Sequence, residues 1–292
     1  MSRILIAGCG YLGQAIGDLF YDSDWEVEGW TSSAASAAKL WAKPYRISPS
    51  DLSDADALAR HSGSWDVVIQ SASTRGGDAS LYRRTYLQGA RNLVERFPDS
   101  RIVFVSSTSV YAQTGGEWVK EESVANPEHD TGKVLREAEE VVLNHRGVVA
   151  RLAGLYGPGR AFLLTRVLSG EAVMDSQSDR YVNQVHRDDA AAAVFLLANR
   201  PSAAGAIYNV VDDEPILRSE CYRWLATRLN LPLPAVGRSA VNPKRGRSNK
   251  RVSNAKLQEI GWAPRYPTFA RAMEESILPS FNLGPEREKP VE

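Results

Sequence analysis

Three glycines near the start of the chain have the spacing needed to hold a dinucleotide. A G-x-G-x-x-G turn begins at Gly8, directly after the apolar run Ile4–Ala7, and it opens a helical pattern. Its first two glycines allow a tight turn and a close backbone approach to a pyrophosphate, and the third lets helix and strand pack closely. The free N–H groups of the following helix would face the phosphates. We therefore expect a phosphate site formed by Gly8, Gly10, Tyr11, Leu12 and Gly13.

The end of the second predicted strand bears on which dinucleotide is bound. An acidic residue there would bind the ribose 2′-hydroxyl and repel a 2′-phosphate. This strand instead ends in the uncharged hydroxyl residues Thr31 and Ser32, and Glu28 lies too early in the strand to take that role. No arginine follows to attract a phosphate. The sequence leaves NAD and NADP open, with a modest preference for NADP.

These residues must be positioned by an alternating series of strands and helices. Strands are predicted at Ile4–Ala7, Glu26–Thr31, Tyr45–Ser48, Val67–Gln70, Ile102–Ser106 and Val148–Leu152. Helices are predicted at Leu12–Tyr21, Asp54–Arg60, Tyr82–Arg96 and Gly132–His145. Apolar strands alternating with amphipathic helices are typical of a doubly wound parallel sheet. The pattern predicts an α/β fold of Rossmann type.

The pattern becomes irregular after Gly157-Pro158-Gly159. Helices are predicted at Phe162–Leu168, Ala190–Asn199 and near Ser219–Leu229, and a strand at Ile207–Val211. We expect a dinucleotide-binding domain over 1–160 and a smaller C-terminal substrate lobe over 161–283, interleaved with the last strand of the main sheet. The Pro-, Glu- and Lys-rich tail Gly284–Glu292 is expected to be disordered.

The composition limits the possible partners. Lys+Arg and Asp+Glu both total 35 in 292 residues, so no basic surplus indicates a nucleic acid or an anionic membrane. The two cysteines, Cys9 and Cys221, are too few for a disulfide framework or a metal site. The N-terminal run enters the glycine turn without the pattern of a secretory signal. We therefore expect a cytoplasmic protein that binds no metal.

Six further motifs follow in a fixed order. They are Asp51-Leu52, Val68–Ser73, Val105–Tyr111, Arg151–Gly159, Val185–Asp189, and Lys250–Asn254 followed by Leu257 and Gly261-Trp262. In type and order they resemble the extended short-chain dehydrogenase/reductases, the group of nucleotide-sugar epimerases and dehydratases. Within that group the chain is similar to the atypical branch that includes the YeeZ-like proteins. The resemblance covers almost the whole chain.

The resemblance implies roles for individual residues. Ser107, four positions before Tyr111, matches the family's catalytic Ser/Thr, and His186 matches a residue that braces the loop between the lobes. Contacts to the cofactor are implied for Thr31, Ser32, Asp51, Leu52, Ser71, Ala72, Ser73 and Leu155. Contacts to the substrate are implied for Arg75, Ser109, His186 and Arg247.

The chain departs from the family at the catalytic helix. Ordinary members carry Tyr-x-x-x-Lys, in which the lysine lowers the pKa of the phenol so that it can exchange a proton near neutral pH. Aligning Gly132 and Glu139 with the family motif places Thr131 at the tyrosine position and Leu135 at the lysine position. A threonine hydroxyl is too weak an acid for that role, and leucine cannot activate it.

A second alignment pairs His129 with Lys133, which lie on one helix face at i, i+4. It requires a shift of the glycine that anchors the first alignment. Ser107, Thr131, His129 and Lys133 are therefore the candidate catalytic residues.

A basic stretch indicates the charge of the substrate. In the family this region faces substrate phosphates, for which the arginine fork is suited. Its members are Arg238, Lys244, Arg245, Arg247, Lys250 and Arg251. A polar, anionic metabolite such as a nucleotide sugar is the expected substrate.

Two functions fit these residues. The first is an NAD(P)-dependent oxidoreductase, epimerase or dehydratase without the usual Tyr–Lys pair. The second is a non-catalytic NAD(P)-binding sensor or regulatory protein, which the absent proton donor favours. Related proteins dimerise through two helices, here Tyr82–Arg96 and Gly132–His145, so a homodimer is possible by analogy.

Overall fold

The structure is a computed structural model, and it describes residues 1–74, 76–175, 179–237 and 248–281. Arg75, the predicted tail, and four residues of the basic stretch (Arg238, Lys244, Arg245 and Arg247) lie outside these residues, so the expectations placed on them stay predictions.

Seven parallel strands form the central sheet in the order β12-β7-β5-β4-β1-β2-β3. The strands are β1 (Arg3–Ala7), β2 (Glu26–Thr31), β3 (Arg46–Pro49), β4 (Val67–Gln70), β5 (Arg101–Ser107), β7 (Val148–Leu152) and β12 (Ile207–Val210). Because β1 pairs with both β2 and β4, the strand order reverses beside it, and ligands of such sheets bind beyond the carboxyl ends at this point. The predicted Rossmann-type fold is confirmed.

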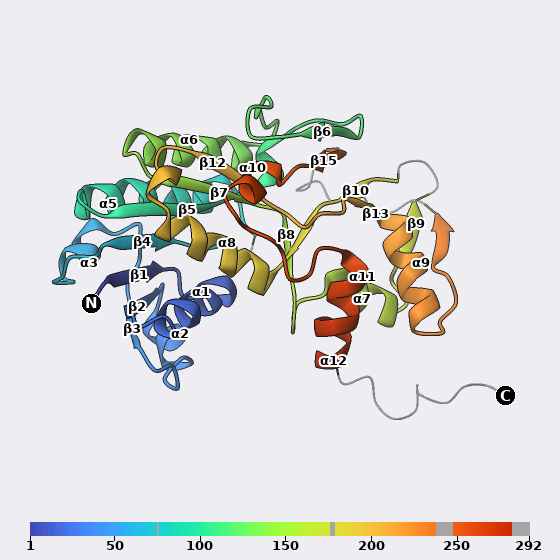
Figure 1. Ribbon diagram of the computed structural model, residues 1–292, viewed down its shortest axis with the longest axis horizontal. Coiled ribbons are helices and arrows are strands. Elements are labelled where there is room, and N and C mark those ends of the chain that lie inside the picture. Colours follow the sequence, from blue (N-terminus) through green and yellow to red (C-terminus); the bar gives the residue numbers. More distant parts are fainter. Residues whose placement is uncertain (75, 176–178, 238–247, 282–292) are drawn as a thin grey trace.

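Helices cover both faces of the sheet (Figure 1). α1 and α8 pack together on one face, and α5 and α6 cover the other. The helices that connect the first strands and flank the sheet are α1 (Tyr11–Tyr21), α2 (Ala34–Ala38), α3 (Ala55–Ala59), α4 (Ala79–Tyr82), the π-helical stretch η1 (Arg83–Gln88), α5 (Gly89–Arg96), the 3₁₀ turn η2 (Thr108–Val110), α6 (Asp130–Asn144) and α8 (Arg187–Asn199). On α1 the residues Leu12, Ile16 and Phe20 are buried at i, i+4 and i+8, which fixes the face that meets the sheet.

A second group of elements lies at the carboxyl edge of the sheet (Figure 1). Its helices are α7 (Phe162–Leu168), α9 (Arg218–Arg228), α11 (Phe269–Ala272), the π-helical stretch η5 (Met273–Ile277) and α12 (Leu278–Ser280). Two further elements belong to the main core: the 3₁₀ turn η3 (Pro201–Ala203) precedes β12, and α10 (Ala255–Glu259) packs on β12. Its strands form two-stranded sheets, which are β8 (Gly154–Tyr156) with β11 (Gln184–His186), β9 (Val173–Asp175) with β14 (Ala235–Gly237), β10 (Tyr181–Val182) with β13 (Ile216–Leu217), and β6 (Glu117–Val119) with β15 (Lys250–Val252).

The buried apolar residues form two clusters. The larger surrounds the central sheet and includes residues from α8, β12 and α10, far along the chain. The smaller joins α7, α9 and the helices from Phe269 onward. The chain thus returns to the first core after Phe162, and the predicted division at residue 160 stays a prediction. Among the described helices none is long and apolar enough to cross a membrane.

Candidate dinucleotide site

The glycine turn is shaped by close backbone packing. Gly8 has a φ of +114°, and a Cβ there would lie 2.1 Å from the backbone nitrogen of Ala72. A Cβ on Gly13 would lie 2.3 Å from the carbonyl oxygen of Gly8. Both glycines are therefore required by the protein's own packing. Gly8 lets the turn pack against the segment after β4, and Gly13 lets α1 pack against the turn.

Gly10 differs from the other two glycines. It is the residue before α1, and a Cβ there would meet nothing within 4 Å. No side chain caps this helix end, and its first turn carries no acidic residue, so its N–H groups face open space. A dinucleotide's diphosphate fits here because the space and the donors are both present.

A cleft leads from the turn across the ends of β2, β3 and β4. It is lined by Gly8, Trp30, Thr31, Ser32, Ser50, Asp51, Leu52, Ala72 and Thr85. Five of the residues predicted to bind the cofactor thus share one cleft with the glycine turn: Thr31, Ser32, Asp51, Leu52 and Ala72. The cleft has the position that an adenosine takes in this kind of fold.

The end of β2 is organised by hydroxyl groups. Thr31 is buried, and its hydroxyl donates to the Ser33 carbonyl at 3.1 Å, while Ser32 is exposed at the cleft. The carboxylate of Glu28 accepts a hydrogen bond from Trp30 Nε1 at 2.9 Å and lies 3.9 Å from His61 Nδ1. Glu28 is thereby directed toward these rings.

The segment after β4 lies against the turn. Ser71 Oγ donates to the Gly8 carbonyl at 3.0 Å, and the backbone nitrogens of Ser71 and Ala72 both donate to the Ala7 carbonyl. Asp51 Oδ1 accepts hydrogen bonds from the nitrogen and the hydroxyl of Ser53, at 2.9 and 2.8 Å, which holds its carboxylate in place at the cleft. Leu155, on β8, is half-buried beside β11.

Ser107 ends β5, at the same edge of the sheet. Its hydroxyl accepts from the Ser109 nitrogen at 3.1 Å and so caps η2, while the Ser109 side chain is exposed. Behind Ser107, the neighbouring Ser106 hydroxyl donates to the buried Glu139 at 2.6 Å. The strand end that presents Ser107 is therefore fixed to α6.

The start of α6 carries the residues of both alignments. Leu135 is buried in the main core, at 4% exposure, and Thr131 is half-buried. Lys133 is more than half exposed, and its ammonium donates to Asp130 at 2.9 Å. His129, the residue before the helix, is exposed. The Thr131–Leu135 side of the helix faces the protein, and the Lys133 side faces solvent.

His186 lies between the lobes and has no exposed surface. Burial lowers its pKa to about 4, so the ring is neutral. Its Nδ1 accepts from the Asp188 nitrogen at 3.2 Å, which leaves the proton on Nε2 to be donated to Ser276 Oγ at 3.0 Å. The ring also packs on Tyr266, with centroids 4.2 Å apart. Through these contacts His186 joins the start of α8 to η5 and holds the two in position.

Three residues of the cleft were missed by the sequence reasoning. Trp30 and Ser50 directly precede the predicted residues Thr31 and Asp51, so their place in the chain could have indicated them. Thr85 lies in η1, a different element, and nothing in the local sequence marks it. The described residues contain no group of His, Cys, Asp and Glu that could hold a metal ion.

The sequence matches the model of the NAD dependent epimerase/dehydratase family over residues 4–210. The chain therefore belongs to this family. It is 32% identical to Protein YeeZ of Escherichia coli strain K12 over 282 residues, which cover 91% of this chain and 97% of that protein.

Two solved structures extend the comparison. A putative NAD-dependent epimerase/dehydratase from Methylobacillus flagellatus is 29% identical and has a TM-score of 0.75. The match covers 94% of this chain and 96% of that chain. The dTDP-glucose 4,6-dehydratase from Bacillus anthracis, in complex with NAD, has a TM-score of 0.79 at 18% identity, with 95% and 96% covered. The second likeness is one of fold.

Proposed function

We propose that the protein is an NAD(P)-dependent enzyme of the epimerase/dehydratase type that acts on a polar, anionic metabolite such as a nucleotide sugar. The observation that carries the proposal is the open space above Gly10, at a helix end with free N–H groups and next to a cleft lined by the predicted nucleotide residues. The nucleotide-sugar substrate is supported by the likeness of fold to the dTDP-glucose 4,6-dehydratase of Bacillus anthracis.

The protein's own groups would divide the work as follows. The N–H groups of Tyr11 and Leu12 would hold the diphosphate, and the cleft would hold the adenosine. The Ser107 hydroxyl would orient the substrate's carbonyl or hydroxyl group. A bound nicotinamide supplies hydride transfer. In the alignment that puts Thr131 at the position of the family's phenol, a different group must move the proton.

A folded variant of the turn tests cofactor binding. Gly10→Val places its side chain in open space, so the protein should fold normally while the diphosphate is displaced. We expect NAD and NADP binding, measured by calorimetry, to be lost in Gly10→Val with the thermal midpoint unchanged. Unchanged affinity in the folded variant would contradict the proposal, as would a wild-type chain that binds neither dinucleotide.

The preference between the dinucleotides is the finer part of the proposal. Ser32 is exposed at the cleft and uncharged, so nothing there repels a 2′-phosphate. Ser32→Asp adds that repulsion without disturbing the Thr31 hydrogen bond. It should weaken NADP about tenfold relative to NAD, and Ser32→Asn is the uncharged control. Tighter binding of NAD than NADP by the wild-type protein would contradict the preference.

A non-catalytic sensor is the second candidate. The observation that favours it is the start of α6, where Leu135 is in the core and the Lys133 ammonium is paired with Asp130 at the surface. If the protein is an enzyme, at least one nucleotide sugar of a panel should change the absorbance of the bound nicotinamide. If the protein is a sensor, it should bind the dinucleotide and show no such absorbance change with any nucleotide sugar.

A further inference from the structure

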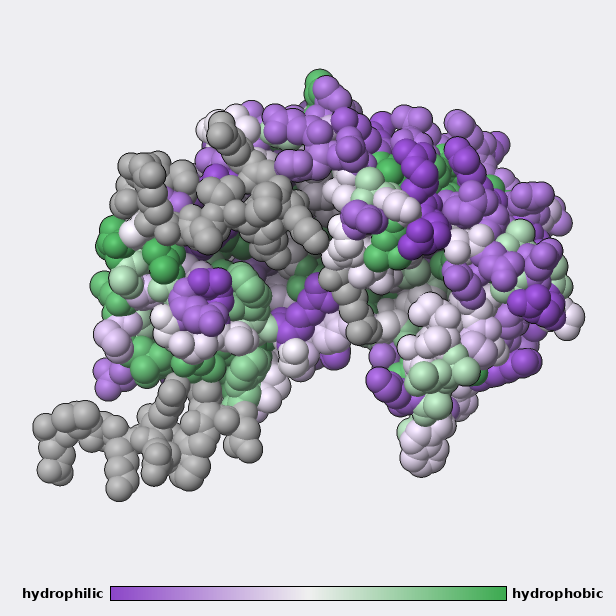
Figure 2. Space-filling view, turned by 180° about the vertical axis from the view of Figure 1, so that it is seen from behind, coloured by the Kyte–Doolittle hydropathy of each residue, from purple (hydrophilic) through white to green (hydrophobic). Residues whose placement is uncertain are grey.

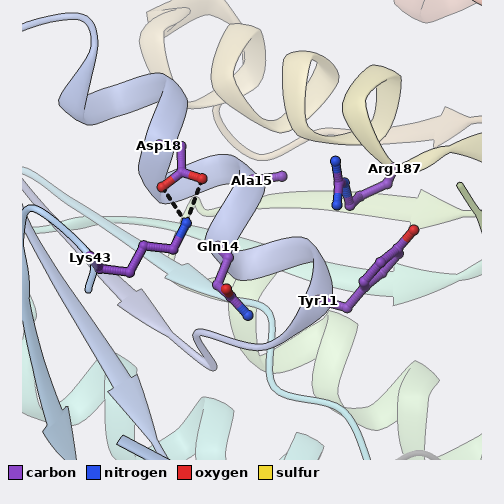
Figure 3. A pocket seen from close by; sticks show the side chains of 6 residues that line it. All are labelled: Tyr11, Gln14, Ala15, Asp18, Lys43 and Arg187. Carbon is purple, nitrogen blue, oxygen red and sulfur yellow. Dashed lines mark hydrogen bonds and ion pairs between the residues drawn. The ribbon is translucent and has the colours of Figure 1, made fainter. Parts of the chain in front are cut away.

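A second cavity lies outside the nucleotide cleft, on the outer side of α1 (Figure 3). It holds about 160 Å³ and shares no lining residue with the nucleotide cleft. Its walls are Tyr11, Gln14, Ala15, Asp18, Lys43 and Arg187. The four α1 residues follow one another at the spacing of one helix stripe, so α1 forms the floor, with Lys43 at one end and Arg187 at the other.

The Lys43 end of the cavity is already neutralised. The Lys43 ammonium donates to both oxygens of Asp18, at 2.7 and 2.6 Å, and Asp18 also accepts from the Tyr45 hydroxyl at 2.9 Å. Figure 3 shows this pair turned toward each other across the end of the groove. Asp18 is therefore bonded at the Lys43 end, and its effect on the Arg187 charge comes after those of Asp188 and Tyr11.

The Arg187 end has hydrogen-bond donors to spare. Arg187 Nε donates to Asp188 at 2.8 Å, and its two terminal amino groups have no acceptor in the described part of the chain. The guanidinium carbon lies 5.2 Å from the centre of the Tyr11 ring, which holds it over that ring. A second cation, the exposed Arg160, lies 5.6 Å from the same ring. Two guanidinium groups thus flank Tyr11, and among the described residues Asp188 is the one carboxylate bonded to them.

The size and charge of the cavity select its ligand. Its volume is below the roughly 300–1,000 Å³ of pockets for larger organic ligands, and well above the ~30 Å³ share of one water molecule. The fork of a guanidinium is suited to the oxygens of a phosphate group. The methyl group of Ala15 leaves the space between the two ends free, and the Gln14 amide borders it.

We propose that this groove is a binding site for a small phosphate-type oxyanion, separate from the dinucleotide's own phosphates. Arg187 is its principal ligand, Arg160 adds to the positive potential, and Tyr11 holds both cations in place. The oxyanion is either free phosphate or the phosphate group of a small metabolite, which present the same chemistry to Arg187.

Calorimetric titration of inorganic phosphate into the full chain at constant ionic strength tests the site. We expect the wild-type protein to bind one phosphate with NAD present at saturation, and Arg187→Gln to bind it at least about tenfold more weakly. Arg228→Gln is the matched control, because it removes the same charge from a surface pair with Glu274. Glycerol phosphate titrated in parallel identifies the source, with tighter binding than inorganic phosphate indicating a metabolite.

Three results would overturn the proposal. The first is equal phosphate affinity in wild type and Arg187→Gln. The second is phosphate binding that saturating NAD abolishes, since the ion would then occupy the glycine turn. The third is equal loss in Arg228→Gln. If NAD itself does not bind, the proposed function fails, but the groove can still be tested. Phosphate is then titrated into Gly10→Val, in which the valine blocks the glycine turn and leaves the Arg187 groove as the remaining site.

Discussion

One cluster of buried polar groups includes a residue of β12 and a second begins just beyond the end of β12, and the two differ in how fully their hydrogen bonds are satisfied. In the first, which we call the Arg151 cluster (Glu139, Arg151, Tyr111 and Asn209), Arg151 donates to Glu139 at 2.9 and 2.7 Å and to the Tyr111 hydroxyl at 2.8 Å. That hydroxyl donates to Asn209 at 2.9 Å. Every charge in this cluster has an opposite charge in contact.

The second cluster, which we call the Asp212 cluster (Asp212, Tyr156 and Gln184), has no such partners. Both oxygens of Asp212, the Tyr156 hydroxyl and Gln184 Nε2 are buried without a hydrogen bond within the described residues. Burial raises the pKa of Asp212 well above its ordinary value, and the nearby Asp213, Glu214 and Asp189 raise it further. The Glu214 backbone N–H lies near the carboxylate without meeting hydrogen-bond geometry, and it opposes the rise in pKa only in part.

The difference indicates two kinds of region. The Arg151 cluster ties β5, α6, β7 and β12 together directly behind Ser107, so it holds this edge of the sheet in one geometry. The Asp212 cluster lies where the central sheet meets the elements of the smaller core, and it costs stability. A satisfied network rigidifies a site, whereas an unsatisfied one is held in place by the packing around it.

Breaking the Arg151 cluster should have the largest effect. Arg151→Met removes the charge that faces Glu139 inside the core, leaving Arg136 as the remaining cation on that carboxylate. We expect the free energy of unfolding, from denaturant titration, to fall by about 3–5 kcal/mol. The control is Arg83→Met. It breaks an exposed pair with Glu137, which lies on α6 as Glu139 does, and it should lower the free energy of unfolding by under about 1 kcal/mol. Equal losses in the two variants would contradict the contrast.

Neutralising Asp212 should have an effect of opposite sign. An acid whose folded pKa is raised contributes stability that is present below its unfolded pKa, near 4, and is lost as the pH rises toward the folded pKa. Asp212→Asn removes this loss. The variant should therefore be more stable than wild type at pH 7, by on the order of 2 kcal/mol, with a gap that widens by up to about 1.4 kcal/mol per pH unit above pH 4. A gap independent of pH would show that Asp212 is ionised in the fold.

The smallest effects come from a matched pair of tyrosines. Tyr111→Phe removes a hydroxyl that makes two hydrogen bonds, and it should cost about 1–2 kcal/mol of unfolding free energy. Tyr156→Phe removes a buried hydroxyl that makes none, and the change should stay within about 0.5 kcal/mol of zero. Thermal and denaturant unfolding of both variants measures the difference. A larger loss for Tyr156→Phe would mean that its hydroxyl has a partner in solution.

Much of the fold could be predicted because its signals are local. The apolar runs placed all seven strands of the central sheet within one or two residues. Helix starts were less well placed: the helix predicted from Tyr82 begins at Ala79, because the Asp78 side chain accepts from the Leu81 nitrogen and caps it. α2 was not predicted. It buries no residue and consists of alanine and serine, so it has no apolar stripe to recognise.

The sequence by itself determined the glycine turn and most of the cleft, because three glycines and the ends of parallel strands must meet at one edge of such a sheet. Only the tertiary structure decided that Lys133 faces solvent while Leu135 enters the core, since two helix faces cannot be ranked without their neighbours. It alone paired Arg151 with Tyr111, 40 residues apart, and Tyr111 with Asn209, 98 residues apart. It also left the Asp212 carboxylate without a hydrogen-bond partner among the described residues. Contacts of this range depend on how the chain packs, and no local pattern records them.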